Sequence, residues 1–145
     1  MRAIGDAGPA IDGSDIVLVE GEIGEVLPPD YRAFLLRYNG GLPTPDIVDI
    51  PKLPGSPTDV QVLFGVRRSV ESSNIAWNWH AYGERIPRGC LPIACDSGGN
   101  LFCMSIVASD KGAISYVDQS ASPWRSYRVA DSFTDFLDAL RDFDS

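Results

Sequence analysis

The side chains best suited to chemistry are the single histidine, His80, and three cysteines, Cys90, Cys95 and Cys103. An imidazole can act as a general base and a thiolate as a nucleophile, so His80 paired through the fold with Cys95 or Cys103 would support covalent catalysis. The sequence contains no phosphate-binding loop, dinucleotide fingerprint, zinc-protease motif, EF-hand loop or serine-nucleophile elbow. Cys95 and Cys103 fall in apolar, strand-like runs, where a thiol usually fills the core. We therefore expect no catalytic residue and no enzymatic activity.

Three aromatic side chains surround the histidine in the sequence: Trp77, Trp79 and Tyr82. The faces of such rings can stack on sugars or nucleobases, which would make this cluster a binding platform. The same spacing also suits a helix that is buried under a sheet. An enzyme or sugar-binding domain centred on His80, Trp77 and Trp79 remains an alternative, and it requires these side chains to line one concave pocket.

The cysteine pattern argues against a structural metal or a disulfide framework. Three is an odd number, and no C-x-x-C pair occurs. Disulfide frameworks use an even number of cysteines, and zinc sites use close pairs. We predict three buried thiols, with no metal and no cofactor.

The chain is acidic, with 20 Asp and Glu against 12 Lys and Arg among 145 residues and a formal charge of −8. Nucleic acids and anionic membranes are themselves negative, so this charge disfavours both as partners and favours a basic protein. The N-terminal residues show no signal-peptide pattern, and no apolar run reaches the roughly 20 residues that a membrane-spanning helix needs. We therefore expect a cytoplasmic protein that binds another protein.

Four aspartates recur near the C-terminus at spacings of four, three and four residues: Asp131, Asp135, Asp138 and Asp142. On a helix this spacing places them on one side as an acidic ridge. The apolar stripe on the other side consists of Phe133, Phe136, Leu137, Leu140 and Phe143. Like charges one turn apart destabilise a helix by about 0.2–0.5 kcal/mol per pair, so stability alone does not select them. We predict that the ridge binds a partner; the alternative is a solvated face that maintains solubility.

Apolar periodicity and turn residues indicate a single α+β domain over residues 1–145. Residues 1–13 are glycine-rich and lack periodicity, so a frayed terminus is expected there. The segment from Ser14 is strand-like by propensity over residues 15–19, but its apolar residues share one helical face, which favours a helix capped by Ser14. The other expected helices are one entered at Pro28-Pro29 and ended by Asn39-Gly40-Gly41, one capped by Ser69 or Ser72 and running to about Tyr82, and one opened by Asp131 or Ser132.

The remaining segments predict an antiparallel sheet. Five prolines make residues 42–58 the longest expected loop, with room for a short edge strand at 47–50. A buried strand is expected at 61–66, and period-two alternation predicts a central meander of 91–95, 100–107 and 114–118, with a further strand at 125–129. The segment Asp96-Ser97-Gly98-Gly99-Asn100 fits the hairpin turn, although an aspartate beside a nest of main-chain N–H groups can also mark an anion site.

Motif residues recur in a characteristic order along most of the chain. They are Leu27-Pro28-x-x-Tyr31-x-x-Phe34-Leu35-x-x-Tyr38-Asn39-Gly40-Gly41, Phe64-Gly65, Ile86-Pro87, Leu91-Pro92-Ile93-Ala94, Asp96-x-Gly98-Gly99-Asn100, Gly112-x-Ile114-x-Tyr116 and Val129-Ala130-Asp131-Ser132-Phe133-x-x-Phe136-Leu137. In this order and spacing they resemble the SUKH superfamily, also called the Smi/Knr family, of bacterial toxin-immunity proteins and fungal cell-wall regulators. Residues 42–58 carry no motif that can be transferred.

The resemblance implies an α+β fold with an antiparallel sheet flanked by helices, usually without catalysis. The matching residues are mostly structural, so the resemblance itself assigns none of them to a site. Family members of the immunity type bind and neutralise a cognate toxin, often a nuclease. We therefore expect a bacterial immunity protein that neutralises a cognate, basic toxin in a stoichiometric complex. The alternative is a non-catalytic intracellular scaffold or regulator like the fungal members.

Overall fold

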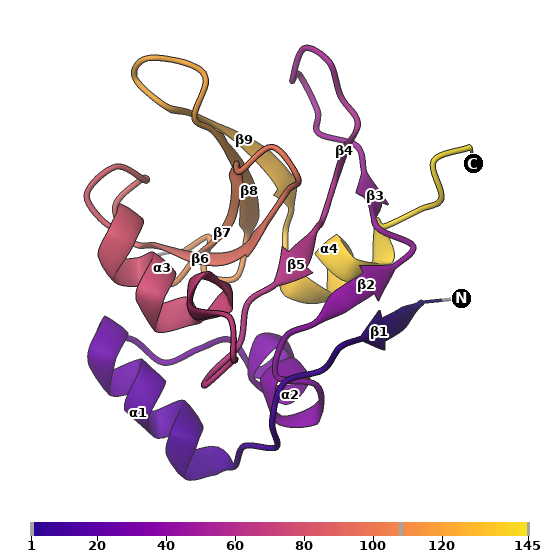
Figure 1. Cartoon of the computed structure of the whole chain (residues 1–145). Helices are drawn as coiled ribbons and strands as arrows, with labels where there is room; N and C mark the ends of the chain where they lie inside the picture. Colours follow the sequence, from indigo (N-terminus) through magenta and orange to yellow (C-terminus); the bar gives the residue numbers. More distant parts are fainter. Residues whose placement is uncertain (1, 108, 145) are drawn as a thin grey trace.

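The structure is a computed structural model that describes residues 2–107 and 109–144 (Figure 1). The helices are α1 (Gly13–Ile23), α2 (Pro29–Arg37), the short 3₁₀ helix η1 (Glu71–Ser73), α3 (Ile75–Tyr82) and α4 (Phe133–Asp138). The strands are β1 (Ala3–Gly5), β2 (Leu42–Thr44), β3 (Ile47–Val48), β4 (Thr58–Asp59), β5 (Val62–Leu63), β6 (Cys90–Cys95), β7 (Leu101–Ser105), β8 (Ile114–Asp118) and β9 (Arg125–Ala130). The predicted α+β class is confirmed.

A five-stranded antiparallel sheet in the order β5-β6-β7-β8-β9 forms the centre of the fold. Leu101 of β7 pairs with Cys95 of β6 on one side and with Val117 of β8 on the other. The predicted meander is therefore confirmed, and the further strand expected at 125–129 is β9. The predicted strand at 61–66 is shorter: β5 covers Val62–Leu63, although the N–H groups of Gln61 and Phe64 also donate to β6 carbonyls.

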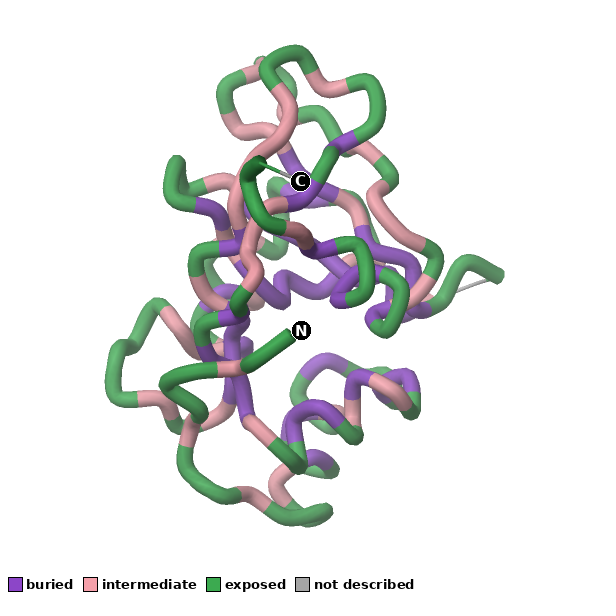
Figure 2. The backbone as a smooth tube through the Cα atoms, turned by 90° about the vertical axis from the view of Figure 1, so that its right-hand side faces the viewer, coloured by how far each residue is buried: buried purple, intermediate pink, exposed green. Residues whose placement is uncertain are grey.

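Helices α2 and α4 pack together against the sheet through aromatic rings. The ring centroid of Phe102 in β7 lies 5.2 Å from that of Tyr116 and 5.2 Å from that of Phe136 in α4. Phe133 of α4 lies 4.9 Å from Tyr31 of α2. All five residues of β7 are buried, so both faces of this strand are covered, and Figure 2 shows the buried positions concentrated in the interior. Burial of apolar side chains in this layer supplies the main stabilisation of the fold.

Residues 3–8 make main-chain pairings within the segment where a frayed terminus was expected. Strand β1 pairs with β2, and the Gly8 N–H donates a 2.9 Å hydrogen bond to the Tyr38 carbonyl. The Arg68 guanidinium donates to the carbonyl (2.8 Å) and carboxylate (3.3 Å) of Asp6. These contacts use main-chain atoms and one distant arginine, so they leave no periodic signal in the first residues.

Two predicted helix caps are wrong. Asp12, and not Ser14, caps α1: its carboxylate accepts from the N–H groups of Ser14 (2.9 Å) and Asp15 (3.2 Å). The Asp15 carboxylate accepts in return from the Asp12 N–H, which completes a capping box. Neither Ser69 nor Ser72 caps α3, because η1 intervenes and α3 begins only at Ile75.

The proline-rich segment and the C-terminal helix meet through main-chain pairing. Of the expected edge strand at 47–50, Ile47–Val48 forms β3 and pairs with β4. Ile47 also exchanges main-chain hydrogen bonds of 3.0 and 2.8 Å with Arg141. This pairing takes the chain away from helical geometry, so α4 ends at Asp138. Phe143, expected in the apolar stripe, is 72% exposed.

Asn39 joins three segments just beyond the end of α2. Its side chain is buried, and its Nδ2 donates to the carbonyls of Pro9 (3.0 Å) and Val66 (2.7 Å), while its Oδ1 accepts from the Val66 N–H (2.7 Å). Its φ of 53° lies in the left-handed region, which Asn tolerates better than most residues. A Cβ at Gly65 would lie 2.1 Å from the Asn39 carbonyl oxygen, so only glycine fits beside it.

Replacing Asn39 with glycine should lower the free energy of unfolding by about 2–4 kcal/mol, because three main-chain groups lose their partners while the backbone conformation stays accessible. Urea denaturation measures the loss, with Glu84→Gln at an exposed position as the control. Equal stability of Asn39→Gly and the wild type would show that the amide does not hold this junction.

Candidate functional site

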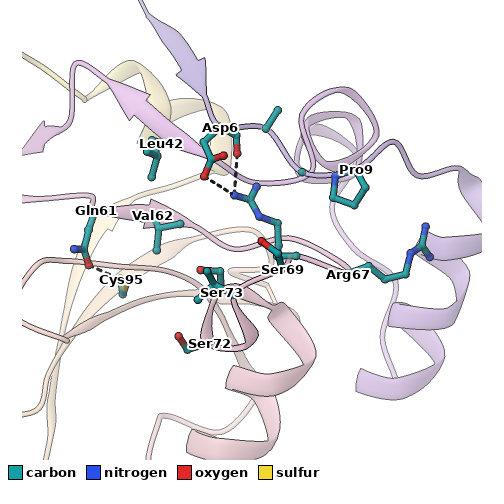
Figure 3. Close-up of a pocket in the computed structure, with 14 residues that line it drawn as sticks. Asp6, Pro9, Leu42, Gln61, Val62, Arg67, Ser69, Ser72, Ser73 and Cys95 are labelled. Carbon is teal, nitrogen blue, oxygen red and sulfur yellow. Dashed lines mark hydrogen bonds and ion pairs between the residues drawn. The ribbon is translucent and has the colours of Figure 1, made fainter.

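A cavity of about 650 Å³ opens where the N-terminal segment, β5 and the segment around η1 meet (Figure 3). Leu42 and Val62 supply apolar surface. Figure 3 shows Gln61 and Cys95 beside Val62. The hydroxyl groups in the lining belong to Ser69, Ser72 and Ser73. These hydroxyls have no hydrogen-bond partner among the described residues. The cavity is therefore suited to binding a group that needs both apolar and polar contacts.

Both arginines of this cavity already bind carboxylates of the chain. The Arg67 guanidinium lies 2.5 Å from Asp15 of α1, and Figure 3 shows it turned away from the cavity. This contact lowers the pKa of the Asp15 carboxyl group. The Arg68 side chain is only 8% exposed and binds Asp6 and the Asn39 carbonyl. Both guanidinium groups therefore join segments of the N-terminal half of the fold. Their partners are distant in the sequence, so no local pattern predicts this role.

The thiol in the cavity is unsuited to nucleophilic attack. The Cys95 Sγ donates to Gln61 Oε1 across 3.9 Å. Burial, with a further contribution from the nearby Asp96 carboxylate, raises the pKa of Cys95 to about 11. Burial raises the pKa of Cys90 and Cys103 as well. All three cysteines are free, but only Cys103 is fully buried, whereas the sequence predicted burial of all three.

Alkylation of Cys95 by iodoacetamide at pH 8 should be roughly a hundredfold slower than that of an ordinary thiol, because the thiolate is the reacting species. Its rate should rise about tenfold per pH unit as the pH approaches the pKa. Mass spectrometry of the modified peptide measures the rate, with glutathione as the reference. A Cys95 rate equal to that of glutathione at pH 8 would contradict the raised pKa.

The structure does not bring His80 and its aromatic neighbours together as a site. His80 is exposed, and its Nε2 lies 2.7 Å from the Glu22 carboxylate of α1. Trp77 is 36% exposed and makes an edge-to-face contact with Tyr82 at 6.2 Å, whereas Trp79 packs against the hydrophobic core. His80, Trp77 and Trp79 thus contact different parts of the protein and do not line one pocket. The sugar-binding or enzymatic site centred on them required such a pocket.

The Asp96 carboxylate completes the hairpin turn and binds within the protein. Asp96 is 3% exposed, and its Oδ1 accepts from the N–H groups of Gly98 (3.0 Å) and Asn100 (2.9 Å). Its Oδ2 accepts from the hydroxyls of Thr58 (2.9 Å) and Tyr116 (2.6 Å). Burial and this carboxylate raise the pKa of Tyr116. Because Asp96 itself takes up the turn's N–H groups, the arrangement favours a structural turn over an anion site.

The four aspartates predicted to form one ridge do not all lie on α4. Asp131 precedes the helix and pairs with Arg128 at 3.2 Å, and Asp142 follows the helix end. Asp135 and Asp138 lie within α4, where Asp138 pairs with Arg2 at 2.7 Å. All four residues are exposed. They therefore form a looser acidic group around α4 instead of a helical ridge.

A groove along β9 was missed by sequence reasoning. Two cavities of about 610 and 560 Å³ follow this strand, and prolines from the segment between β3 and β4 line both. Asp131 and Asp135 line the first of them. The walls come from segments far apart in the sequence, so no local pattern predicts the groove.

Within residues 2–107 and 109–144, no helix is long and apolar enough to cross a bilayer, and no group of three or more His, Cys, Asp or Glu side chains is placed to hold a metal ion.

Two comparisons with known proteins agree with the family resemblance that the motif residues indicate. The sequence model of the SMI1 / KNR4 family (SUKH-1) matches residues 10–139, a range that includes α1 to α4 and the five-stranded sheet. The chain is also similar to the SPbeta prophage-derived uncharacterized protein YokK of Bacillus subtilis (strain 168). The two are 33% identical over 156 residues, which cover 94% of this chain and 80% of that protein.

Proposed function

Because the chain belongs to the SMI1 / KNR4 family (SUKH-1), we propose that it is an immunity protein that binds a cognate, basic toxin and neutralises it in a stoichiometric complex. The observation that carries this proposal is the net charge of −8 on a member of this family. A strongly negative protein attracts a basic partner over distances up to about a Debye length, roughly 8 Å at physiological salt, and rejects nucleic acid.

Such a function needs affinity and no chemical step. The protonated thiol of Cys95 and the internally bonded carboxylate of Asp96 fit a protein that acts by contact alone. Inhibition by occupancy requires only that the complex cover the partner's active site for longer than the partner needs to act. A location in the cytoplasm belongs to this proposal, since an immunity protein of this kind protects the cell that makes it.

The acidic group around α4 is the part of the surface that we assign to the basic partner: Asp131, Asp135, Asp138 and Asp142. The side chains of Asp131 and Asp138 are 86% and 62% exposed even though each pairs with an arginine. Exposed ion pairs contribute little, typically below about 1 kcal/mol, so cations of a partner can replace these internal pairs at small cost. The expected effect is faster association, because exposed charges act mainly on the rate of encounter.

Neutralising the four aspartates as Asp131→Asn, Asp135→Asn, Asp138→Asn and Asp142→Asn should slow association with the cognate toxin about tenfold at low salt. The salt dependence of the association rate should also become weaker. Stopped-flow fluorescence at several salt concentrations measures both quantities.

The matched control removes the same charge elsewhere, through Glu22→Gln, Glu25→Gln, Glu71→Gln and Glu84→Gln, four exposed positions away from α4. Both sets change the net charge from −8 to −4. A larger effect of the aspartate set supports the acidic group around α4. Equal effects would assign the attraction to overall charge, and a failure of the wild type to bind the toxin would refute the proposed function.

A further inference from the structure

The outer edge of β9 is unpaired in the described structure. The sheet order ends at β9, whose pairing partner is β8 alone. Arg125, Ser126 and Arg128 in this strand are exposed. An open edge presents N–H and C=O groups that another extended chain can bind. Figure 1 shows β9 at the border of the sheet, with the segment between β3 and β4 at the same end of the molecule.

The ladder between β7 and β8 shows which main-chain groups point outward. The Ser105 N–H donates a 2.9 Å hydrogen bond to the Ala113 carbonyl, so this pair is hydrogen-bonded across the two strands. In antiparallel pairs the hydrogen-bonded positions alternate. Ser115 and Val117 therefore direct their main-chain groups to β7, and Tyr116 directs its groups to β9.

The same alternation continues into β9. Tyr116 pairs with Tyr127, and Asp118 pairs with Arg125, so Tyr127 and Arg125 use their main-chain groups to bind β8. Ser126, between them, directs its N–H and C=O to the free edge. Arg128, two residues further, does the same. No described residue hydrogen-bonds to these main-chain groups.

The free edge lies beside two cavities that follow β9. The cavities of about 610 and 560 Å³ share Tyr127 and follow β9 in both directions from it. Pro51 and Lys52 line one cavity, and Pro54 lines the other. Neighbouring strands lie about 4.8 Å apart, and no strand of the described chain pairs with this edge of β9.

We infer that an extended segment of the partner protein adds to β9 as a sixth strand, bound by the main-chain groups of Ser126 and Arg128, with an acidic side chain facing Lys52. This inference rests on the proposed function, because the partner is the cognate toxin. Lys52 is exposed and has no carboxylate partner among the described residues, although the chain is strongly acidic overall. Charge complementarity therefore places an acidic residue of the added segment at Lys52, and basic residues of the partner at Asp131 and Asp135, which line the same cavity.

A second copy of this chain fits the edge less well. The segment around Pro51 and Pro54 lines the cavities beside β9. If two β9 edges paired, each copy would have to make room for this segment of the other copy. The irregular pairing around Val129, where the register shifts by one residue, also bends the strand and discourages a long edge-to-edge contact. A single extended segment avoids both obstacles.

The test compares Ser126→Pro with Ser126→Ala in binding to the purified cognate toxin. Proline removes the outward N–H and leaves the bonds to β8 in place, whereas alanine changes only the side chain. We expect Ser126→Pro to raise the Kd at least tenfold and Ser126→Ala to change it less than twofold. Lys52→Glu should raise the Kd at least fivefold, whereas Lys111→Glu, an equal charge change at another exposed lysine, should not. Calorimetry measures these affinities.

Hydrogen exchange on the wild-type complex gives a readout that does not depend on the folding of any variant. Protection of the Ser126 and Arg128 amides on toxin binding supports the added strand. A tight complex without this protection, and with an unchanged Kd for Ser126→Pro, overturns the inference and leaves the proposed function intact. Absence of any complex overturns both. A dimer of the free chain that Ser126→Pro dissociates, with no change in toxin affinity, assigns the edge to a second copy and also overturns it.

Discussion

One buried side-chain amide holds together segments that the sheet alone would leave separate. Asn39 binds the carbonyls of Pro9 and Val66 and the Val66 N–H, and its own carbonyl accepts from Arg68. Buried main-chain groups are costly when unpaired, so this side chain fixes where the N-terminal segment and the chain after β5 lie. The cavity of Figure 3 opens between those same two segments. Its shape therefore depends on the amide of Asn39.

Two polar groups that could do chemistry, the Asp96 carboxylate and the Cys95 thiol, are engaged within the protein. Asp96 uses both carboxylate oxygens to bind groups of its own chain, and Cys95 stays protonated near neutral pH because its pKa is about 11. The exposed surface instead combines carboxylates around α4 with an open strand edge at β9. Charge acts at a distance and main-chain pairing acts on contact, so the two features can contribute to successive stages of one association.

Sequence periodicity predicted the helices and strands whose formation depends on neighbouring residues. The spacing of Tyr31, Phe34 and Leu35 indicated α2, and period-two alternation indicated the meander, because one face of each element must be buried. The pairing of Ile47 with Arg141 shows what such patterns omit: it joins residues distant in the sequence, and it shortens α4 and exposes Phe143. Contacts between distant residues also decided the arrangement of the acidic group around α4. The aspartates were found by their spacing, but their arrangement followed from where the helix ends.

The groove along β9 shows most clearly that local patterns cannot predict a surface built from distant segments. Neither the strand nor the proline-rich segment is unusual alone, and the groove exists only because the fold places Pro51 and Lys52 beside Tyr127. Family motifs did not help, because the residues that match the family are mostly structural.

Titration of the cognate toxin's activity with the purified chain tests most directly whether this protein acts by occupying its partner. Occupancy predicts that activity falls in proportion to the added chain and reaches zero at one equivalent, with toxin of unchanged mass recovered when the complex is dissociated. Complete inactivation by a small fraction of an equivalent, or a covalently altered toxin, would show that the chain works as a catalyst instead.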